Sequence, residues 1–429
     1  MKKMKPSGVE WIGDIPQEWD IYKLKYLVTY NDEVLDEKTD SDFEFDYIDI
    51  SSVEYQKGIV SLQRMRFSDA PSRARRIVRE KDIIISTVRT YLKAVASIGF
   101  LTFPQIASTG FIVLRARNNK ALSKFLHYAV LANSFISMVE AHSVGVSYPA
   151  INASDVVKIP ISIPTLYEQK VIAEFLDRKC AEIDSIIGKT KATVEEYKAL
   201  KQAVITQAVT KGIRPDRPMK DSGVEWIGDI PQEWDIVKMK HLGRCRNGLT
   251  YSPENVVDEE IGTLVLRSSN IKDGKLMFSD NVFVNNDIRE ELMVKQGDIL
   301  ICSRNGSRSL IGKNAIIPKN LVATFGAFMM IFRCDKPEYV RYILSSQIFS
   351  YYLGTFLTST INQLTADNFN NMQVVYCQDV REQVEIITYL DHKCAEIDRL
   401  IAAKEQLLTE LESYKKSVIY EYVTGKKEV

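Results

Sequence analysis

A fifteen-residue segment that occurs twice constrains the fold of this 429-residue chain more than any other feature. The sequence SGVEWIGDIPQEWDI occupies residues 7–21 and returns unchanged at residues 222–236, 215 positions later. A second pair, LDRKCAEIDSII from Leu176 and LDHKCAEIDRLI from Leu390, is identical at nine of twelve positions. Repeats at a constant offset of 214 or 215 residues indicate an internal tandem duplication. We therefore predict two half-molecules of one fold.

The middle of each half differs strongly between the copies but reads as the same kind of structure. Short hydrophobic runs recur there, namely DYIDISSV, KDIIISTV and GFIVLRA in the first half and GTLVLRSS, GDILICS and AFMMIFRC in the second. Runs of this length that are rich in Ile, Val and Phe are typical of buried strands. The faint match of VREKDIIIS to VKQGDILIC indicates one mixed α/β fold with two different surfaces.

Each half closes with a hydrophobic stripe on alternating steps of four and three, interleaved with charged residues. The stripe consists of Ile172, Leu176, Ile183, Ile187, Val194, Tyr197 and Val204, and then of Ile386, Leu390, Ile397, Ile401, Leu408, Leu411 and Val418. This period predicts an amphipathic helix of roughly 40 residues, about 60 Å long, in each half. Gly212 and Gly425 lie where the helices should end. A coiled coil between the two helices is the favoured arrangement, and two separate helices, each on its own domain, are the alternative.

These features predict an α+β chain in four parts. The first mixed α/β domain spans residues 1–164 and includes the repeated segment, and the first long helix spans residues 165–212. The second domain spans residues 213–378 and the second helix residues 379–425. Trp11 and Trp19 are expected to anchor the repeated segment as a packing loop.

The charge distribution permits a positive surface on a neutral molecule. Lys plus Arg and Asp plus Glu number 56 each, so net charge alone indicates no acidic partner. Residues 64–93, however, contain nine basic and three acidic side chains, whereas the charged side chains of residues 32–54 are mainly acidic. Such segregation predicts a local positive face, to which a polyanion would respond.

Catalytic, metal and membrane signatures are missing from the sequence. No apolar run approaches the roughly 18 residues of a membrane span, and a cytoplasmic location is expected. The six cysteines and four histidines are dispersed, so neither a zinc site nor a disulfide framework is expected. The string GSRSLIGKN from Gly306 has the wrong spacing for a P-loop. Glu182 and Asp184, which recur in the second copy, are interpreted as a solvated helix face. We expect a chain that performs no catalysis and binds no cofactor.

Taken together, these segments resemble the specificity subunit of Type I restriction-modification systems. WIGDIPQEW, EQKVIAEFLDRKCAEID and the helix ends AVTKG and YVTGK look like the conserved regions of that family and occur in its order. The resemblance covers essentially the whole chain. One departure is the approach to the second helix, VVYCQDVREQ, which lacks the prolines of IPISIPTLYEQ in the first half.

The resemblance implies a function and a set of partners. Each middle would be a target recognition domain that reads one half of a bipartite DNA sequence, and the two helices would pair antiparallel and set the spacer between the halves. Two methyltransferase subunits would dock on the duplicated frame, joined by translocase-nuclease restriction subunits, in a nearly circular plan with pseudo-twofold symmetry. S-adenosylmethionine, ATP and magnesium would be used by these partners. The duplication then has a physical reason, because two identical partners need the same surface twice, whereas the DNA target need not repeat.

The residues expected to touch DNA lie on loops beside the predicted strands. Base readout uses Arg or Lys for guanine and Asn or Gln for adenine, next to groups that position the phosphates. Suitable segments are residues 72–76, the loops after KDIIIS and GDILIC, and the stretches HSVGVSYP and LTSTINQL before each domain's exit. The candidates are Arg73, Arg75, Arg76, Arg89, Tyr91, Lys93, Ser147, Tyr148, Arg304, Asn305, Ser307, Arg308, Lys313, Asn362 and Gln363.

Two other classes of function remain open at this point. A structural scaffold with two protein- or glycan-binding domains on a coiled coil explains the repeat and the helices but gives no reason for Arg-rich loops at matched positions. A duplicated nuclease requires a carboxylate–metal cluster, which the sequence does not offer.

Overall fold

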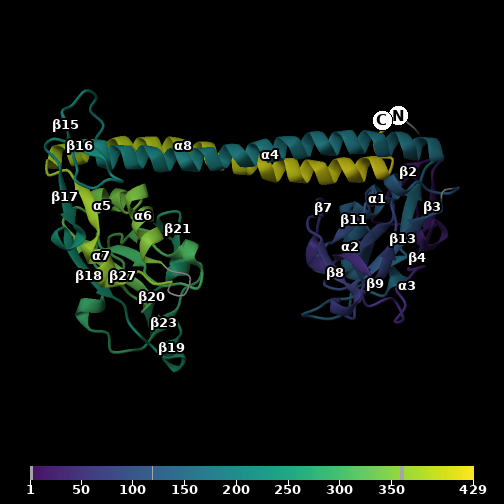
Figure 1. Cartoon of the computed structure of the whole chain (residues 1–429), viewed down its shortest axis with the longest axis horizontal. Helices are drawn as coiled ribbons and strands as arrows, with labels where there is room; N and C mark the ends of the chain where they lie inside the picture. The colour runs from purple at the N-terminus through teal and green to yellow at the C-terminus, as the bar shows by residue number, and fades with distance from the viewer. Residues whose placement is uncertain (1–2, 118, 358–361) are drawn as a thin grey trace. The chain divides into compact units, whose positions relative to one another are not determined.

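The computed structural model describes residues 3–117, 119–357 and 362–429 and divides into two compact units (Figure 1). Unit 1 comprises Met1–Lys191 and Gln406–Val429, and unit 2 comprises Ala192–Glu405. Two long helices, α4 (Leu166–Lys211) and α8 (Val380–Val423), are each divided between the two units. The first part of α4 and the last part of α8 belong to unit 1, and the remaining parts belong to unit 2. The first domain is therefore completed by residues from the end of the chain.

Unit 1 contains two four-stranded sheets. The first has the order β11-β10-β13-β4 and is antiparallel throughout, and the second has the order β8-β5-β12-β9 with β5 and β12 parallel. The strands are β4 (Val28–Tyr30), β5 (Glu44–Ile48), β8 (Gln63–Arg66), β9 (Ala74–Val78), β10 (Ile83–Ser86), β11 (Val95–Ser97), β12 (Gln105–Ser108) and β13 (Phe111–Ala116). Every residue of β10 is buried, which explains why three consecutive isoleucines, Ile83 to Ile85, form most of it.

Unit 2 also contains two four-stranded sheets; the first repeats the topology found in unit 1, and the second differs from it in its edge strands. Its sheets have the orders β18-β27-β24-β25 and β19-β23-β20-β26, and β20 pairs parallel with β26 as β5 does with β12. The strands are β18 (Gly243–Asn247), β19 (Val256–Val257), β20 (Thr263–Leu266), β23 (Phe283–Val284), β24 (Ile299–Cys302), β25 (Asn314–Ile316), β26 (Ala323–Phe325) and β27 (Met329–Cys334). All six hydrophobic runs form strands, so the expectation of one mixed α/β fold in both halves is confirmed.

Short helices and two-stranded pairs complete the units. Unit 1 has α1 (Ser123–Leu131), α2 (Asn133–Ala141), α3 (Ala153–Val156) and the pairs of β1 (Met4–Pro6) with β2 (Asp14–Pro16), β3 (Asp20–Lys23) with β14 (Pro160–Ile163), and β6 (Val53–Glu54) with β7 (Gly58–Ile59). Unit 2 has α5 (Pro337–Ile343), α6 (Gln347–Phe356), α7 (Ala366–Asn371) and the pairs of β15 (Met219–Asp221) with β16 (Asp229–Pro231), β17 (Asp235–Lys238) with β28 (Gln373–Tyr376), and β21 (Ile271–Lys272) with β22 (Lys275–Leu276). The exit strand β28 forms without proline, because its Val374 and Val375 are buried as Ile161 and Ile163 are in β14.

The two long helices pair antiparallel within each unit. In unit 1, Lys415 Nζ contacts Asp184 Oδ1 at 2.7 Å, and Lys191 Nζ lies 3.9 Å from Glu412 Oε1. The residue numbers of the partners on α8 thus fall as those on α4 rise, which shows that the helices run in opposite directions. In unit 2, Lys201 Nζ contacts Asp398 Oδ1 at 2.7 Å. The coiled-coil expectation is confirmed, and the alternative of separate helices is wrong.

Asp184 and Glu182 lie on an exposed helix face, as expected, and the Asp184 side chain is 53% exposed. Asp184 also pairs with Lys415, whose side chain is only 5% exposed, so this ion pair joins the two helices. The pair Lys201–Asp398 occupies the equivalent positions 214 residues away. Sequence reasoning missed these contacts because the partner lies on the other helix.

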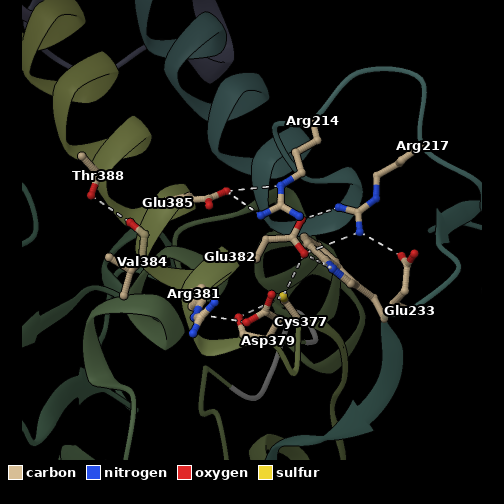
Figure 2. A network of polar contacts seen from close by, with 11 residues as sticks. Arg214, Arg217, Glu233, Cys377, Asp379, Arg381, Glu382, Val384, Glu385 and Thr388 are labelled. Carbon is tan, nitrogen blue, oxygen red and sulfur yellow. Dashed lines mark hydrogen bonds and ion pairs between the residues drawn. The ribbon is translucent and has the colours of Figure 1, made fainter.

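Each repeated segment docks on the start of a long helix through a tryptophan. Trp19 Nε1 donates to Glu168 Oε1 at 3.4 Å in unit 1, and Trp234 Nε1 donates to Glu382 Oε2 at 3.2 Å in unit 2. Both indole rings are buried, and Trp11 is half-buried, which agrees with the expected packing role. In unit 2, Arg214 and Arg217 add ion pairs with Glu385 and Glu382 (Figure 2).

The repeated segments also contact the far ends of the helices. Lys211 Nζ, at the end of α4, donates to the carbonyl of Asp229 at 2.9 Å. Just beyond α8, Lys426 Nζ donates to the carbonyl of Asp14, which is the equivalent position. Tyr420 Oη donates to the carbonyl oxygens of Trp11 and Ile12 at 3.4 and 3.3 Å. The N-terminal segment therefore lies at the end of the second helix, as its copy at residues 222–236 lies at the end of the first.

Among the described residues, no helix is both long and apolar enough to cross a bilayer.

Candidate nucleic-acid interface

In the first domain, the two predicted reading loops lie against each other. Val88, in the loop after β10, forms a β-bridge with Ala150, in the loop after α2. The amide of Ile151 donates to the carbonyl of Thr87 at 2.9 Å, and Thr90 Oγ1 donates to Ser143 Oγ at 2.8 Å. Two segments that the sequence predicted separately thus form one surface.

The exposed side chains of this surface combine a cation with aromatic rings. The Arg89 guanidinium lies over the ring of Tyr148, with 5.2 Å between its Cζ and the ring centroid. Tyr91 is 51% exposed, and Ser147 is exposed as well. Lys93 differs, because its Nζ pairs with Glu140 at 3.2 Å.

The arginines of residues 73–76 do not all lie on a loop as expected. Arg75 and Arg76 belong to strand β9, and only Arg73 precedes it. Arg76 is half-buried, and burial lowers the pKa of its guanidinium. The Arg75 guanidinium stacks over the ring of Phe67 at 4.9 Å. Arg73 donates to Tyr47 Oη and to Asp49 Oδ2, at 3.1 and 3.2 Å.

Residues 73–76 nevertheless border the loop surface. The turn between β12 and β13 lies between the two segments, since the amide of Thr109 donates to the carbonyl of Arg73 at 2.7 Å. On its other side, the amide of Thr87 donates to the carbonyl of Gly110 at 2.8 Å. The candidates of the first domain are therefore contiguous along one edge.

The expected positive face is smaller than the sequence suggested. Antiparallel pairing of β5 with β8 places Glu44 opposite Arg66 and Asp46 opposite Arg64, so the acidic stretch neutralises the basic one. The ion pairs in this basic stretch are Arg64–Asp46, Arg66–Asp42, Arg66–Glu44, Arg73–Asp49, Arg79–Glu33, Lys81–Glu80 and Lys93–Glu140. Within the part of the chain that the structure describes, Arg75, Arg76 and Arg89 alone among these nine basic residues lack a carboxylate partner.

The second domain brings its two predicted loops together in the same way. Arg304, in the loop after β24, forms a β-bridge with Gln363. The amide of Leu364 donates to the carbonyl of Ser303 at 2.8 Å, and Asn362 Nδ2 donates to the carbonyl of Gly306 at 3.5 Å. Residues 358–361 of the LTSTINQL segment lie outside the described residues.

Arg304 resembles Arg89 in its surroundings. Its guanidinium lies 5.3 Å from the ring centroid of Phe328, an exposed residue in the turn before β27. Sequence reasoning missed Phe328; the available signal was an aromatic residue directly before a buried strand. Across residues 3–117, 119–357 and 362–429, no carboxylate pairs with Arg304, Arg308 or Lys313.

The remaining candidates of the second domain are partly engaged within the protein. Asn305 Nδ2 donates to Ser268 Oγ at 3.1 Å, and its Oδ1 accepts from the amide of Ser307 at 2.9 Å. Arg308 donates to the carbonyl of Gly354 at 3.2 Å. Lys313 is half-buried, so Arg304 and Arg308 carry most of the accessible charge.

Both domains thus present an arginine over an aromatic ring after equivalent strands. Stacking on a ring holds the planar guanidinium in place and leaves its N–H edge free for two parallel hydrogen bonds. That edge matches the two acceptors of guanine or a phosphate.

The described residues contain no cluster of three His, Cys, Asp or Glu side chains that could hold a metal ion.

Comparisons with known proteins agree on one family. Residues 16–196 match the family model described as the type I restriction modification DNA specificity domain. The chain is 25% identical over 428 residues to the type I restriction enzyme MjaVIII specificity subunit of Methanocaldococcus jannaschii, covering 96% of this chain and 93% of that protein. It is 28% identical to the EcoKI specificity subunit of Escherichia coli, over 46% of this chain and 44% of the relative.

Solved structures show the same fold. A chain from a study of complex assembly and conformational transition in a type I restriction-modification system matches with a TM-score of 0.76 at 21% identity, covering 96% of this chain and 99% of that one. The HsdS subunit of Thermoanaerobacter tengcongensis matches with a TM-score of 0.51 at 22% identity, over 96% and 98% of the two chains. On these matches, residues 16–196 correspond to a type I restriction modification DNA specificity domain, and the chain as a whole is similar to type I restriction enzyme specificity subunits.

Proposed function

We propose that this chain selects the DNA sequence on which a type I restriction-modification complex acts, each domain reading one half of a bipartite target. One observation carries the proposal: the loop after β10 and the loop after β24 occupy the same structural position, and each offers an arginine that is stacked on a ring and has no carboxylate partner among the described residues. The surrounding side chains differ, as two readers of two different sequences require.

The partners follow from the duplicated frame. The Trp–Glu contacts at the helix starts and the Lys–Asp pairs between the helices occur once in each unit, so nearly the same frame is offered twice. Such a frame suits two copies of one methyltransferase subunit. S-adenosylmethionine, ATP and magnesium belong in this proposal to the methyltransferase and restriction subunits, while the chain itself contributes specificity and no catalysis.

Modified-base sequencing of host DNA, with the gene present and deleted, tests the proposal. Loss of methylation at a split motif, two short defined parts around an unspecified gap, is the expected result. Unchanged methylation in cells that express the chain with its methyltransferase would contradict it. A gel shift across a salt series adds an independent check, because binding through phosphates weakens steeply as salt rises.

Arg89→Ala and Arg304→Ala are each expected to weaken specific DNA binding by about 1–3 kcal/mol and to relax selectivity in one half-site only. Arg64→Ala is the matched control, because Arg64 is equally a surface arginine but is paired with Asp46. Affinity for the target and for an unrelated duplex, measured at one salt concentration, separates the two roles. An equal loss on both duplexes would reduce Arg89 and Arg304 to phosphate contacts.

Four residues inserted into one long helix, about 6 Å of helix, are expected to lengthen the unspecified spacer by one or two base pairs of about 3.4 Å each. The reason is the proposed role of the helix pair in setting the spacing between the half-sites. The methylated motif of cells expressing the insertion variant gives the spacer directly. The same four residues placed in the exposed loop at Asp40 serve as the control, and an unchanged spacing in the helix variant would exclude the role.

A further inference from the structure

The loop after α2 exposes three apolar side chains at its tip. Val144 is 81% exposed, Val146 is fully exposed and Tyr148 is 67% exposed. They alternate with Gly145 and Ser147 along a segment of five residues. Apolar side chains that are exposed to water do not contribute to the stability of the fold. A cluster of them on a surface loop therefore indicates a place where another molecule binds.

The tip is held in this exposed position by its own backbone. The amide of Val144 donates to the carbonyl of Ala150 at 2.8 Å, and the amide of Ala150 donates back to the carbonyl of Val144 at 3.0 Å. Gly145 has a φ of +112°, a conformation that glycine adopts and L side chains rarely do. The bridge from Val88 to Ala150 fixes the base of the tip to the neighbouring loop. These backbone contacts hold the valines at the exposed tip.

The surroundings of the tip indicate what binds there. Tyr148 lies under the guanidinium of Arg89, which has no carboxylate partner in the part of the chain that the structure describes. Tyr91 and Leu92, on the adjoining loop, are 51% and 40% exposed. Apolar groups and a free cation thus share one surface, which fits a polyanion that carries an apolar group within reach of its charged backbone.

We infer that the Val144–Val146 tip contacts the 5-methyl group of thymine in the half-site read by the first domain. The inference rests on the proposed function and adds the kind of contact to it. The thymine methyl is the one apolar group on the base edges of the major groove. The half-site of the first domain must then contain at least one A·T pair. In the described part of the counterpart segment of the second domain, Asn362 and Gln363 carry amide side chains, which suit adenine.

Replacing thymine by deoxyuridine tests this contact, since the exchange removes the methyl group and preserves every hydrogen bond. The full chain, in complex with its methyltransferase, is titrated with duplexes of its own split motif carrying the replacement in one half-site at a time. We expect about fourfold weaker binding for each contacted thymine, the value of one buried methyl group, in one of the two half-sites.

Two variants make the result specific to the tip. Val146→Ser is expected to remove the difference between thymine and deoxyuridine, and it leaves the fold intact because the side chain is fully exposed. Phe100→Ser alters an apolar side chain of the same domain that is 81% exposed, and is expected to leave the difference unchanged.

The failure of this inference is distinguishable from failure of the proposed function. Equal binding of thymine and deoxyuridine duplexes, a difference that persists in Val146→Ser, or two half-sites of G·C pairs alone would overturn the methyl contact while specific binding remains. No preference for the split motif over a scrambled duplex would instead refute the proposed function itself.

Discussion

Replacing Arg217 by methionine is expected to lower the free energy of unfolding of unit 2 by about 3–5 kcal/mol, because it leaves the Glu382 carboxylate buried without its positive partner. The Glu382 side chain is 4% exposed and that of Arg217 12% exposed. Figure 2 shows both residues facing each other where the connection after α4 meets the start of α8. Methionine preserves the alkyl chain, so the lost charge and hydrogen bonds account for the change.

Urea unfolding of the full chain, followed by the fluorescence of its tryptophans, measures this effect. Arg214→Met is the matched control, because the Arg214–Glu385 pair has side chains 49% and 50% exposed. A loss of about 1 kcal/mol or less is expected for the exposed pair. Similar losses for the two variants would show that the buried carboxylate needs no partner, and Glu382→Gln in the Arg217→Met background should restore part of the stability.

The same pair predicts how stability depends on pH. Burial on its own raises the pKa of Glu382, but the hydrogen bonds from Arg217 and Trp234 outweigh it, and the pKa lies below the ordinary 4.5. A lowered pKa in the folded state means that the pair's contribution is present above pH 4.5 and is lost as the pH falls through the folded value. The stability gap between the native chain and Arg217→Met should therefore narrow on acidification.

Gly425→Ala is expected to destabilise unit 1 by about 2–5 kcal/mol through backbone strain and steric overlap combined. Gly425 follows α8 with a φ of +71°, and a Cβ there would lie 2.4 Å from Pro16 Cδ and 3.1 Å from Trp19 Cζ3. The rings of Pro16 and Trp19 cannot move away easily, because both residues are buried. The alanine would push the repeated segment away from the helix end.

Gly8→Ala separates the two contributions to that loss. Gly8 has almost the same φ, +72°, but no atom lies within 4 Å of the Cβ position. It should lose only the backbone part, about 1–2 kcal/mol. Thermal or urea unfolding of both variants gives the comparison, and equal losses would mean that the contact with Pro16 and Trp19 costs nothing.

Local periodicity made most of the fold predictable. The strands and long helices follow from short apolar runs and a stripe with steps of four and three, and the repeated segment predicted matched docking in both halves. Cross-strand partners leave no such signal. Asp46 and Arg64 are eighteen positions apart, and only the register of β5 with β8 makes them neighbours. This is why the sequence overestimated the positive face of the first domain.

The candidate interface was predictable in outline but not in detail. Each post-strand loop and the stretch before the domain's exit could be predicted separately, because both carry suitable polar side chains, but their contact with each other could not. The sequence predicts a loop at Arg75 and Arg76, whereas pairing of Arg76 with Ala107 of β12 makes the segment a strand. Phe328 could not be predicted as a site residue, because its contact with Arg304 depends on the turn that brings its ring beneath the guanidinium. The roles of these residues in reading DNA stay a prediction.

The completion of the first domain by the end of the chain has a consequence for synthesis. Val418, Ile419 and Val423 belong to the same hydrophobic core as Ile12 and Trp19, and Tyr420 bonds to a carbonyl 409 residues earlier. During translation, the first domain cannot complete its hydrophobic core until the end of the chain has been made. Unit 2, Ala192–Glu405, can complete its own core earlier. A ribosome that stops before Val418 would therefore release a chain whose N-terminal domain is the damaged one, exposed to proteases although every residue of its sheets has been made.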